Sequence, residues 1–343
     1  MAMAKRLKKP SLSNENVAAL PSEFVKRFHE VEPLYKKLAD EIAFSLEKRL
    51  REKAIPFAHV THRTKKFDSL TEKLERKHYE DPWTEVTDFA GVRVVFLYPT
   101  HRPQIESLVE KEFKIVEKVD KLAALDDNQF GYGALHYIVR LSDATSGARY
   151  EDLKDLVCEI QVRTVMQDAW AIIDHHLVYK NEASTPSKLK RKLNIVSGMF
   201  ENIDDQFDRM LLERELYVKE VAKQAKTELS FLQQELNFET LIAYAGKHFS
   251  ELKNAKDDEH VNTVVAALSK FGFKTLENVD SMMKRTKKAF EPMSKKIPSS
   301  YAVSQIARAL ALVSPEYRRK WTPAAQAIFT ELALLIEPSA NKS

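Results

Sequence analysis

Residues 156–180, LVCEIQVRTVMQDAWAIIDHHLVYK, change from the pattern of a strand to the pattern of an amphipathic helix. In the first part, Glu159, Gln161 and Arg163 alternate with apolar residues, which directs a carboxylate, an amide and a guanidinium to one side of a predicted strand. Thr164 can cap the following helix, whose apolar residues recur at helical spacing. A strand end that meets a helix start brings backbone amides and polar side chains together. The stretch therefore predicts a binding site for a charged substrate or an ordinary edge strand beside a helix.

The composition is that of a globular protein, with 44% hydrophobic and 30% charged residues in a chain of 343. No apolar run approaches the roughly 20 residues of a membrane span, and the basic segment at residues 1–20 lacks the apolar part of a signal peptide. We therefore expect a cytoplasmic protein with no membrane partner and a disordered N-terminus. Cys158, the one cysteine, excludes an intrachain disulfide and is expected to be a buried, inert thiol. The net charge of +4 is compatible with nucleotides or RNA and requires neither.

Strand and helix patterns alternate through the first half of the chain. Residues 21–54 repeat apolar side chains every three or four positions and predict helix, with a break near Pro33. Residues 84–98, TEVTDFAGVRVVFLY, contain the nearly continuous apolar run of a central strand. The alternation over residues 57–163 predicts an α/β or α+β domain built on a mixed sheet flanked by helices.

The last third of the chain has almost no strand signal. Residues 188–236 predict one long helix or two, and residues 238–336 continue with helical spacing. We therefore expect a mixed-sheet domain at residues 21–225, followed by an all-helical domain at residues 226–343. The expected fold class of the chain is α+β.

A group of cations follows the first predicted strand. Arg63 and Lys65 are two residues apart and so share one side of an extended segment, while Ser69 and Lys73 are four apart on the next predicted helix. Three cations and a hydroxyl that converge in this way could hold a polyphosphate. The alternative is a solvated basic helix face.

Three further residues suggest chemistry. Asp88 precedes the apolar run of the central strand, where a carboxylate is costly unless it is paired or holds a metal. Gly91 permits close approach to the backbone there. Tyr132, which has a glycine on each side, either stacks on a base or packs in the core.

Four motifs in this order resemble the synthetase domain of the RelA/SpoT family of alarmone synthetases. They are R-T-K-x-x-x-S-x-x-x-K at 63–73, D-F-A-G-V-R at 88–93, G-Y-x-x-L-H at 131–136, and E-I-Q-V-R-T with A-W-A-x-x-D-H and Y-K at 159–180. Each motif alone is weak, but their joint order and spacing are specific. The resemblance covers roughly residues 20–225. The family transfers a pyrophosphoryl group from ATP to the 3′-hydroxyl of a guanine nucleotide, which gives ppGpp or pppGpp.

The resemblance implies a role for each matching residue. Asp88 resembles the magnesium ligand, and Glu159 resembles the second carboxylate, which acts as a metal ligand or as the base for the attacking hydroxyl. Such chemistry depends on positioning and charge neutralisation, so Mg²⁺ and ATP are the implied cofactor and donor. The other matches are Arg63 and Arg93 around the adenine, Lys65, Ser69 and Lys73 on the ATP phosphates, and Tyr132, His136 and Gln161 at the acceptor.

The acceptor side departs from the family pattern. Alarmone synthetases commonly carry basic residues before the Gly-Tyr pair, whereas this chain has Asp126 and Asp127, which would repel acceptor phosphates by roughly 1 kcal/mol if solvated. Asp168 stands where many relatives have a neutral amide near the base. Three acceptors therefore stay open: GDP or GTP, the 3′-terminal adenosine of tRNA, which some toxic members modify and thereby inhibit translation, and an adenine nucleotide. The non-enzymatic alternative is an inactive nucleotide- or RNA-binding module.

The helical domain at residues 226–343 allows three hypotheses. It forms homo-oligomers, it blocks the ATP site as a fused antitoxin-like regulator until a trigger protein binds, or it docks RNA. The chain lacks the His-Asp pair of the family's hydrolase domain, so the resemblance implies synthesis without degradation. The cations that would contact RNA, or otherwise form a solvated helix face, are Lys284, Arg285, Lys287, Lys288, Lys295 and Lys296.

Overall fold

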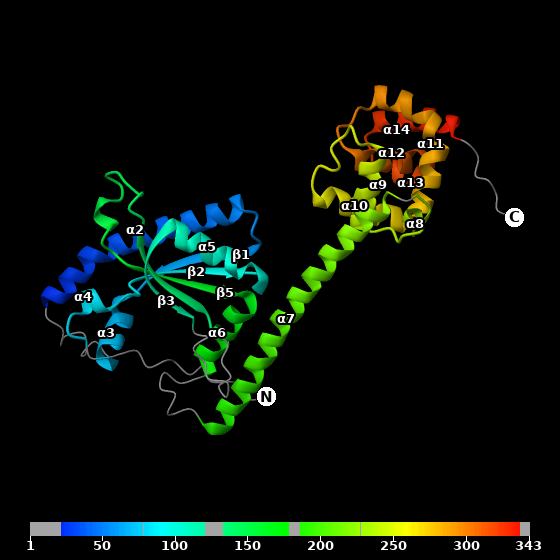
Figure 1. Cartoon of the computed structure of the whole chain (residues 1–343). Helices are drawn as coiled ribbons and strands as arrows, with labels where there is room; N and C mark the ends of the chain where they lie inside the picture. Colours follow the sequence, from blue (N-terminus) through cyan, green and yellow to red (C-terminus); the bar gives the residue numbers. More distant parts are fainter. Residues whose placement is uncertain (1–21, 78, 121–132, 178–185, 227, 337–343) are drawn as a thin grey trace, which may run out of the picture. The chain divides into compact units, whose positions relative to one another are not determined.

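The computed structural model describes residues 22–77, 79–120, 133–177, 186–226 and 228–336 (Figure 1). The predictions for residues 1–20, Asp126, Asp127 and Tyr132 lie outside the described residues. The chain divides into two compact units, Met1–Leu211 and Leu212–Ser343. The division falls inside one long helix, α7 (Ser187–Gln224), at whose end the sequence predicted the domain boundary.

The first unit is built on a five-stranded sheet with the strand order β1-β2-β5-β4-β3. The central neighbours β2 and β5 run parallel, and the other neighbours run antiparallel. The predicted mixed sheet is therefore confirmed. The strands are β1 (Phe57–Thr64), β2 (Ala90–Phe96), β3 (Phe113–Asp120), β4 (Leu135–Leu141) and β5 (Cys158–Thr164).

Helix α2 (Ser22–Glu52), blue in Figure 1, covers one face of this sheet. Its apolar side chains join those of α5 (Arg102–Glu112) and of the strands in one core, which also buries Cys158 as expected. The predicted break at Pro33 is wrong, because α2 continues through it. Phe28 before the proline and Tyr35 after it pack into the same core, so tertiary contacts outweigh the lost backbone hydrogen bond.

The opposite face of the sheet carries the polar residues of the central strands. Val92 and Ile160 point into the α2 core, so the alternation of side chains directs Arg93 and Gln161 to the other side. Helix α6 (Val165–Leu177) begins directly after β5 and packs against α7 through a small apolar cluster of its own. The shorter helices of the unit are α3 (Phe67–Arg76), α4 (Pro82–Glu85), η1 (Pro99–His101) and η2 (Glu151–Leu153).

The second unit is helical, as predicted. Its core surrounds α12 (Ala302–Val313), whose residues 302–312 are nearly all buried. In the described part of the chain, no helix has both the length and the apolarity to cross a bilayer. The remaining helices are α8 (Glu228–Leu232), α9 (Phe238–His248), α10 (Asp258–Lys270), α11 (Leu276–Lys296), α13 (Pro315–Arg318), α14 (Pro323–Leu332) and η4 (Ala333–Leu335).

Candidate active site

Two rows of residues cross the sheet on the face opposite α2. The register pairs Arg63 of β1 with Gly91 of β2, and Gly91 with Glu159 of β5. Neighbouring strands are about 4.8 Å apart, so side chains in one row lie within reach of one another. The second row, two residues along each strand, consists of Thr61, Arg93, Gln161 and His136.

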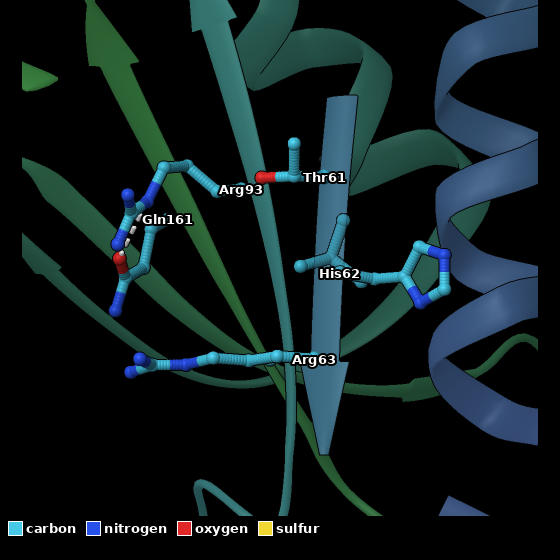
Figure 2. Close-up of a pocket in the computed structure, with 7 residues that line it drawn as sticks. Thr61, His62, Arg63, Arg93 and Gln161 are labelled. Atoms are coloured by element: carbon cyan, nitrogen blue, oxygen red, sulfur yellow. Dashed lines mark hydrogen bonds between the residues drawn. The ribbon is translucent and has the colours of Figure 1, made fainter. Parts of the chain in front are cut away.

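The arginines of the two rows line a hollow of about 130 Å³ (Figure 2). Arg63 and Arg93 leave their strands on the same side, and the Nε of Arg93 donates to Oε1 of Gln161 at 3.3 Å. His62 points the opposite way, and its Nδ1 lies 3.2 Å from Oδ1 of Asp40 on α2. His62 therefore contributes to the wall of the hollow but directs its ring toward α2, whereas Arg63 and Arg93 point away from that helix.

Gly91 forms the floor between Arg63 and Glu159. A Cβ atom built on Gly91 would lie 3.8 Å from Cγ and 4.0 Å from Nε of Arg63, which is ordinary van der Waals contact. The backbone therefore does not require glycine. The missing side chain instead leaves open space beside Arg63 for a ligand.

Asp88 lies two residues before β2 and is bound by two lysines. Lys65 Nζ lies 2.6 Å from Oδ2 of Asp88, and Lys73 Nζ lies 2.8 Å from Oδ1. Burial alone would raise the pKa of Asp88, but the hydrogen bonds and charges of the two lysines outweigh it and hold the pKa below the usual range. Asp88 is therefore ionised at neutral pH. Ser69 lies on α3 one turn before Lys73, and its side chain is exposed.

Glu159 is held by hydrogen bonds on both of its oxygens. Its Oε1 lies 2.8 Å from Nδ1 of His136, and its Oε2 accepts from Nε2 of Gln161 at 2.8 Å. Burial would raise the pKa of Glu159, but His136 and Gln161 lower it below the usual value, against an opposing effect of the charge on Asp88. The second ring nitrogen of His136, Nε2, is buried without a hydrogen-bond partner among the described residues.

The carboxylates of Asp88 and Glu159 lie near the amino ends of two parallel neighbouring strands. Within the described ranges, no group of three or more His, Cys, Asp or Glu side chains could hold a metal ion. Magnesium commonly binds one or two carboxylates together with water and substrate phosphates. The donor set therefore fits Mg²⁺ that arrives with a phosphate ligand, and does not form a closed protein cage.

Two residues beside Arg93 were not among the predicted site residues: Asp168, which the sequence placed near the acceptor base, and Arg163, for which it gave only the side of the strand. Asp168 of α6 lies with Oδ1 2.9 Å from Nη1 of Arg93 and 3.7 Å from Nη1 of Arg163. Burial, and then the charge of Arg93, lower the pKa of Arg163 to about 10. The alternation of β5 already put Arg163 on the same side as Glu159, and that was the available signal.

The structure brings the predicted site residues that it describes to one face of the sheet and its adjoining edge. A second hollow of about 300 Å³ shares Arg63, Arg93 and Gln161 with the first and extends to α6. The neighbouring hollows give room for more than one ligand group. Ser69 is placed only by its position on α3, one turn before Lys73. The residues brought together are Arg63, Lys65, Lys73, Asp88, Arg93, His136, Glu159 and Gln161.

Three basic residues of α11, in the second unit, form ion pairs with neighbouring acids. Lys284 Nζ lies 2.7 Å from Oδ2 of Asp280, and Lys296 Nζ lies 2.8 Å from Oε2 of Glu331. Lys295 likewise pairs with an acid one turn earlier. These pairs reduce the positive charge that the cluster would offer to RNA.

Comparison with known proteins finds similarity over the part of the chain that carries these motifs. Residues 62–184 match the region found in RelA / SpoT proteins. The chain is 28% identical over 160 residues to the GTP pyrophosphokinase YjbM of Bacillus subtilis (strain 168), across 45% of this chain and 72% of that protein. It is 27% identical over 158 residues to the GTP pyrophosphokinase YwaC of the same organism, across 44% and 72% respectively.

Two solved structures align with part of the chain. The crystal structure of small alarmone synthetase 1 from Bacillus subtilis aligns with 25% identity and a TM-score of 0.47, over 55% of this chain and 98% of that one. A GTP pyrophosphokinase family protein from Streptococcus pneumoniae aligns with 24% identity and a TM-score of 0.46, over 56% and 94%. The family match over residues 62–184 lies wholly within the first unit.

Proposed function

We propose an activity for this chain from its similarity to RelA/SpoT proteins: the first unit transfers the β,γ-pyrophosphoryl group of ATP to the 3′-hydroxyl of GDP or GTP. The products are AMP and ppGpp or pppGpp. The names of the relatives, both GTP pyrophosphokinases, support a diphosphokinase of this kind. We propose the cytoplasm, where both nucleotides occur, as its location.

The observation that carries the proposal is the position of two ionised carboxylates beside a row of cations. Asp88 and Glu159 lie near the amino ends of parallel β2 and β5, and Lys65 and Lys73 bind the first of them. Phosphoryl-type transfer needs such an arrangement, because positioning and neutralisation of phosphate charge supply most of the catalysis.

The donor would bind on the β1 side of the site. We propose that the adenine lies between Arg63 and Arg93, over the open space that Gly91 leaves. The phosphates would then lie toward Lys65 and Lys73, with the Ser69 hydroxyl one turn away on α3. These lysines can exchange their contact with Asp88 for a contact with phosphate oxygens.

The carboxylates would divide the chemistry. Mg²⁺ would be held by Asp88 and Glu159 and would neutralise charge on the transferred phosphates when bound. Glu159, oriented by His136 and Gln161, accepts the proton of the 3′-hydroxyl. The 3′-oxygen forms a bond to the β-phosphorus, the bond from that phosphorus to the bridging oxygen of the α-phosphate breaks, and AMP leaves with that oxygen.

The acceptor would lie on the β4 side, where His136 and Gln161 line the sheet and Tyr132 remains the predicted stacking ring. The buried Nε2 of His136 supports this placement, because a hydroxyl group of the acceptor nucleotide would give this nitrogen the hydrogen-bond partner that it lacks among the described residues. A guanine nucleotide is the acceptor that the relatives' names support. The tRNA and adenine nucleotide alternatives are outcomes of the same test.

The test follows the label of ATP marked in its γ-phosphate. We expect the wild-type protein with Mg²⁺ to label GDP or GTP and to release AMP, and Asp88→Asn and Glu159→Gln to release none. Label on bulk tRNA, or on ATP supplied alone, would replace the guanine acceptor with that species. Nucleotide binding with no AMP formed would identify an inactive binding module and overturn the proposal.

For the second unit, the hypotheses of oligomer formation, inhibition relieved by a trigger protein, and RNA docking remain proposals. Expression of the chain without residues 240–343 separates two of them. Growth arrest on removal would support an inhibitory role, because an active first unit would be released. Loss of activity in the shortened chain would support a structural role.

A further inference from the structure

Asp168 lies in the first turn of α6, where the hydrogen bonds of the strand–helix junction fix its direction. Thr164, the last residue of β5, accepts at Oγ1 from the backbone N of Gln167 at 3.0 Å. The side-chain Oε1 of Gln167 accepts in return from the backbone N of Thr164 at 2.9 Å. This reciprocal pair has the form of a capping box and is buried, so the turn that carries Asp168 is rigid.

The carboxylate of Asp168 joins arginines from two strands. Its Oδ1 lies 2.9 Å from Nη1 of Arg93 on β2 and 3.7 Å from Nη1 of Arg163 on β5. The side chain is 11% exposed, so this interaction is screened less than a surface ion pair. Without Asp168, two neighbouring guanidinium groups would repel each other in a partly buried place.

Arg93 is held at two points of its guanidinium group. Its Nε donates to Oε1 of Gln161 at 3.3 Å, and its Nη1 donates to Oδ1 of Asp168 at 2.9 Å. Two contacts on different nitrogens fix the plane of a guanidinium, whereas one contact leaves it free to rotate. A fixed plane is what stacking on a base requires, because stacking depends on parallel surfaces at a set separation.

We propose that Asp168 is a positioning residue for the donor: it fixes the plane of Arg93 and keeps Arg163 from displacing it. The inference rests on the proposed function for the identity of the donor, and it concerns the binding of ATP rather than the transfer. The proposal also places Asp168 at the donor site, whereas the sequence placed it near the acceptor base.

The test measures the binding of a non-hydrolysable ATP analogue, with its α,β-bridging oxygen replaced by a methylene, by calorimetry in the presence of Mg²⁺. We expect Asp168→Ala to raise the Kd about 30-fold and Asp168→Asn, which keeps an acceptor oxygen, to raise it only about 5-fold. The KM for GTP should stay within about twofold of the wild-type value. Asp143→Ala, at a side chain that is 90% exposed, serves as the control and should change neither constant.

A double-mutant cycle distinguishes positioning from general stabilisation. In an Arg93→Ala background, Asp168→Ala should change the Kd of the analogue by less than about twofold, because the residue through which it acts is gone. Additive losses would overturn the proposal, as would an increase in the KM for GTP with an unchanged Kd for the analogue. Asp168→Asn keeps the size of the side chain, so it carries the same test if Asp168→Ala does not fold.

The two proposals fail in different ways. If the wild-type protein binds the analogue but transfers no label, the proposed function fails while the effect of Asp168 on binding is still measured. If label is transferred but the Asp168 variants bind the analogue as well as the wild type does, only the positioning role fails. Absence of analogue binding to the wild type would overturn both.

Discussion

Two aspartates of the first unit, the half-buried Asp88 and the buried Asp204, differ in how tightly they bind a proton. Lysine ammonium groups lie 2.6 and 2.8 Å from the oxygens of Asp88 and keep its pKa low in spite of burial. Asp204, on α7, is 4% exposed and accepts a hydrogen bond from Oγ1 of Thr164 at 2.6 Å. Burial, and then the charges of Asp208 and Asp205, raise the pKa of Asp204 to about 7.

The difference shows that the charged neighbours of a carboxylate that is shielded from water decide what it can do. Asp88 keeps a negative charge at neutral pH, so a divalent cation or a lysine can bind it. Asp204 is close to the point of gaining a proton, so it suits a hydrogen bond that ties α7 to the end of β5. We therefore expect changes at Asp88 to affect chemistry, and the same changes at Asp204 to affect stability.

The largest effect is expected when Asp88 loses its charge. Asp88→Asn removes the charge that would bind Mg²⁺ and should lower the rate of AMP release about 1,000-fold. Asp204→Asn is the matched control and should keep the rate within about twofold of wild type. A variant at Asp88 that retains a tenth of the wild-type rate, with an unchanged melting temperature, would contradict the assignment.

The lysines provide a second way to change the region around Asp88. Lys73→Met frees Oδ1 of Asp88 from a cation at 2.8 Å, so Mn²⁺ should bind the nucleotide-free variant more tightly than wild type. The same change removes a phosphate contact and should weaken binding of ATP roughly 30-fold. Electron paramagnetic resonance of Mn²⁺ and calorimetry with ATP measure the two effects.

The neighbouring Lys66 is the control for this change. Lys66 directly precedes α3 and its side chain is exposed, so Lys66→Met should alter neither Mn²⁺ nor ATP binding. If Lys73→Met left Mn²⁺ binding unchanged, the lysine would not compete with the cation for Asp88.

The fold was predictable where a local pattern determines it. The alternation of Glu159, Gln161 and Arg163 gave the polar face of β5, and the apolar run at 92–97 gave the buried strand β2. The strand order was not predictable, because β2 pairs with β5 across more than 60 residues of chain and no local pattern records that pairing. Pro33 shows the limit of a local rule, since packing on both sides of it maintains the helix.

For the site, the sequence predicted which residues belong together but not the contacts between them. Motif order identified Asp88 and its lysines as one site, but the ion pairs of Asp88 with Lys65 and Lys73 depend on how β1 and α3 meet β2. The contact of Asp168 with Arg93 spans 75 residues, and spacing along the chain gives no sign of it. Contacts of this kind form only when the sheet assembles.

Gly91 allows a change that leaves both aspartates in place. Gly91→Ala adds a Cβ atom 3.8 Å from Arg63, a distance that the protein tolerates, in the space proposed for the adenine. We expect the Kd of the ATP analogue to rise about 10-fold while the melting temperature stays constant or rises slightly, because glycine is unfavourable in a strand. A lower melting temperature together with normal binding would mean that Gly91 serves the fold and not the ligand.

The smallest effect is expected at Asp204, whose raised pKa should make the free energy of unfolding depend on pH. The native pKa of about 7 lies above the ordinary value of 3.8, so the folded state binds the proton more tightly than the unfolded state does. The stabilisation is complete below about pH 4 and is lost as the pH rises to about 7. Asp204→Asn, which has no proton to lose, should therefore match wild type near pH 4 and exceed it by about 1 kcal/mol at pH 8, a value reduced by solvent screening of the neighbouring aspartates.

Urea unfolding at several pH values measures this difference, and Asp205 supplies the control. Asp205→Asn removes one of the negative charges that raise the pKa of Asp204, so the loss of stability should occur at lower pH and be smaller than in wild type. Equal pH dependence in wild type and Asp204→Asn would contradict the raised pKa. Because burial is the largest cause of the shift, part of the pH dependence should persist in Asp205→Asn, and its complete loss there would mean that charge repulsion dominates instead.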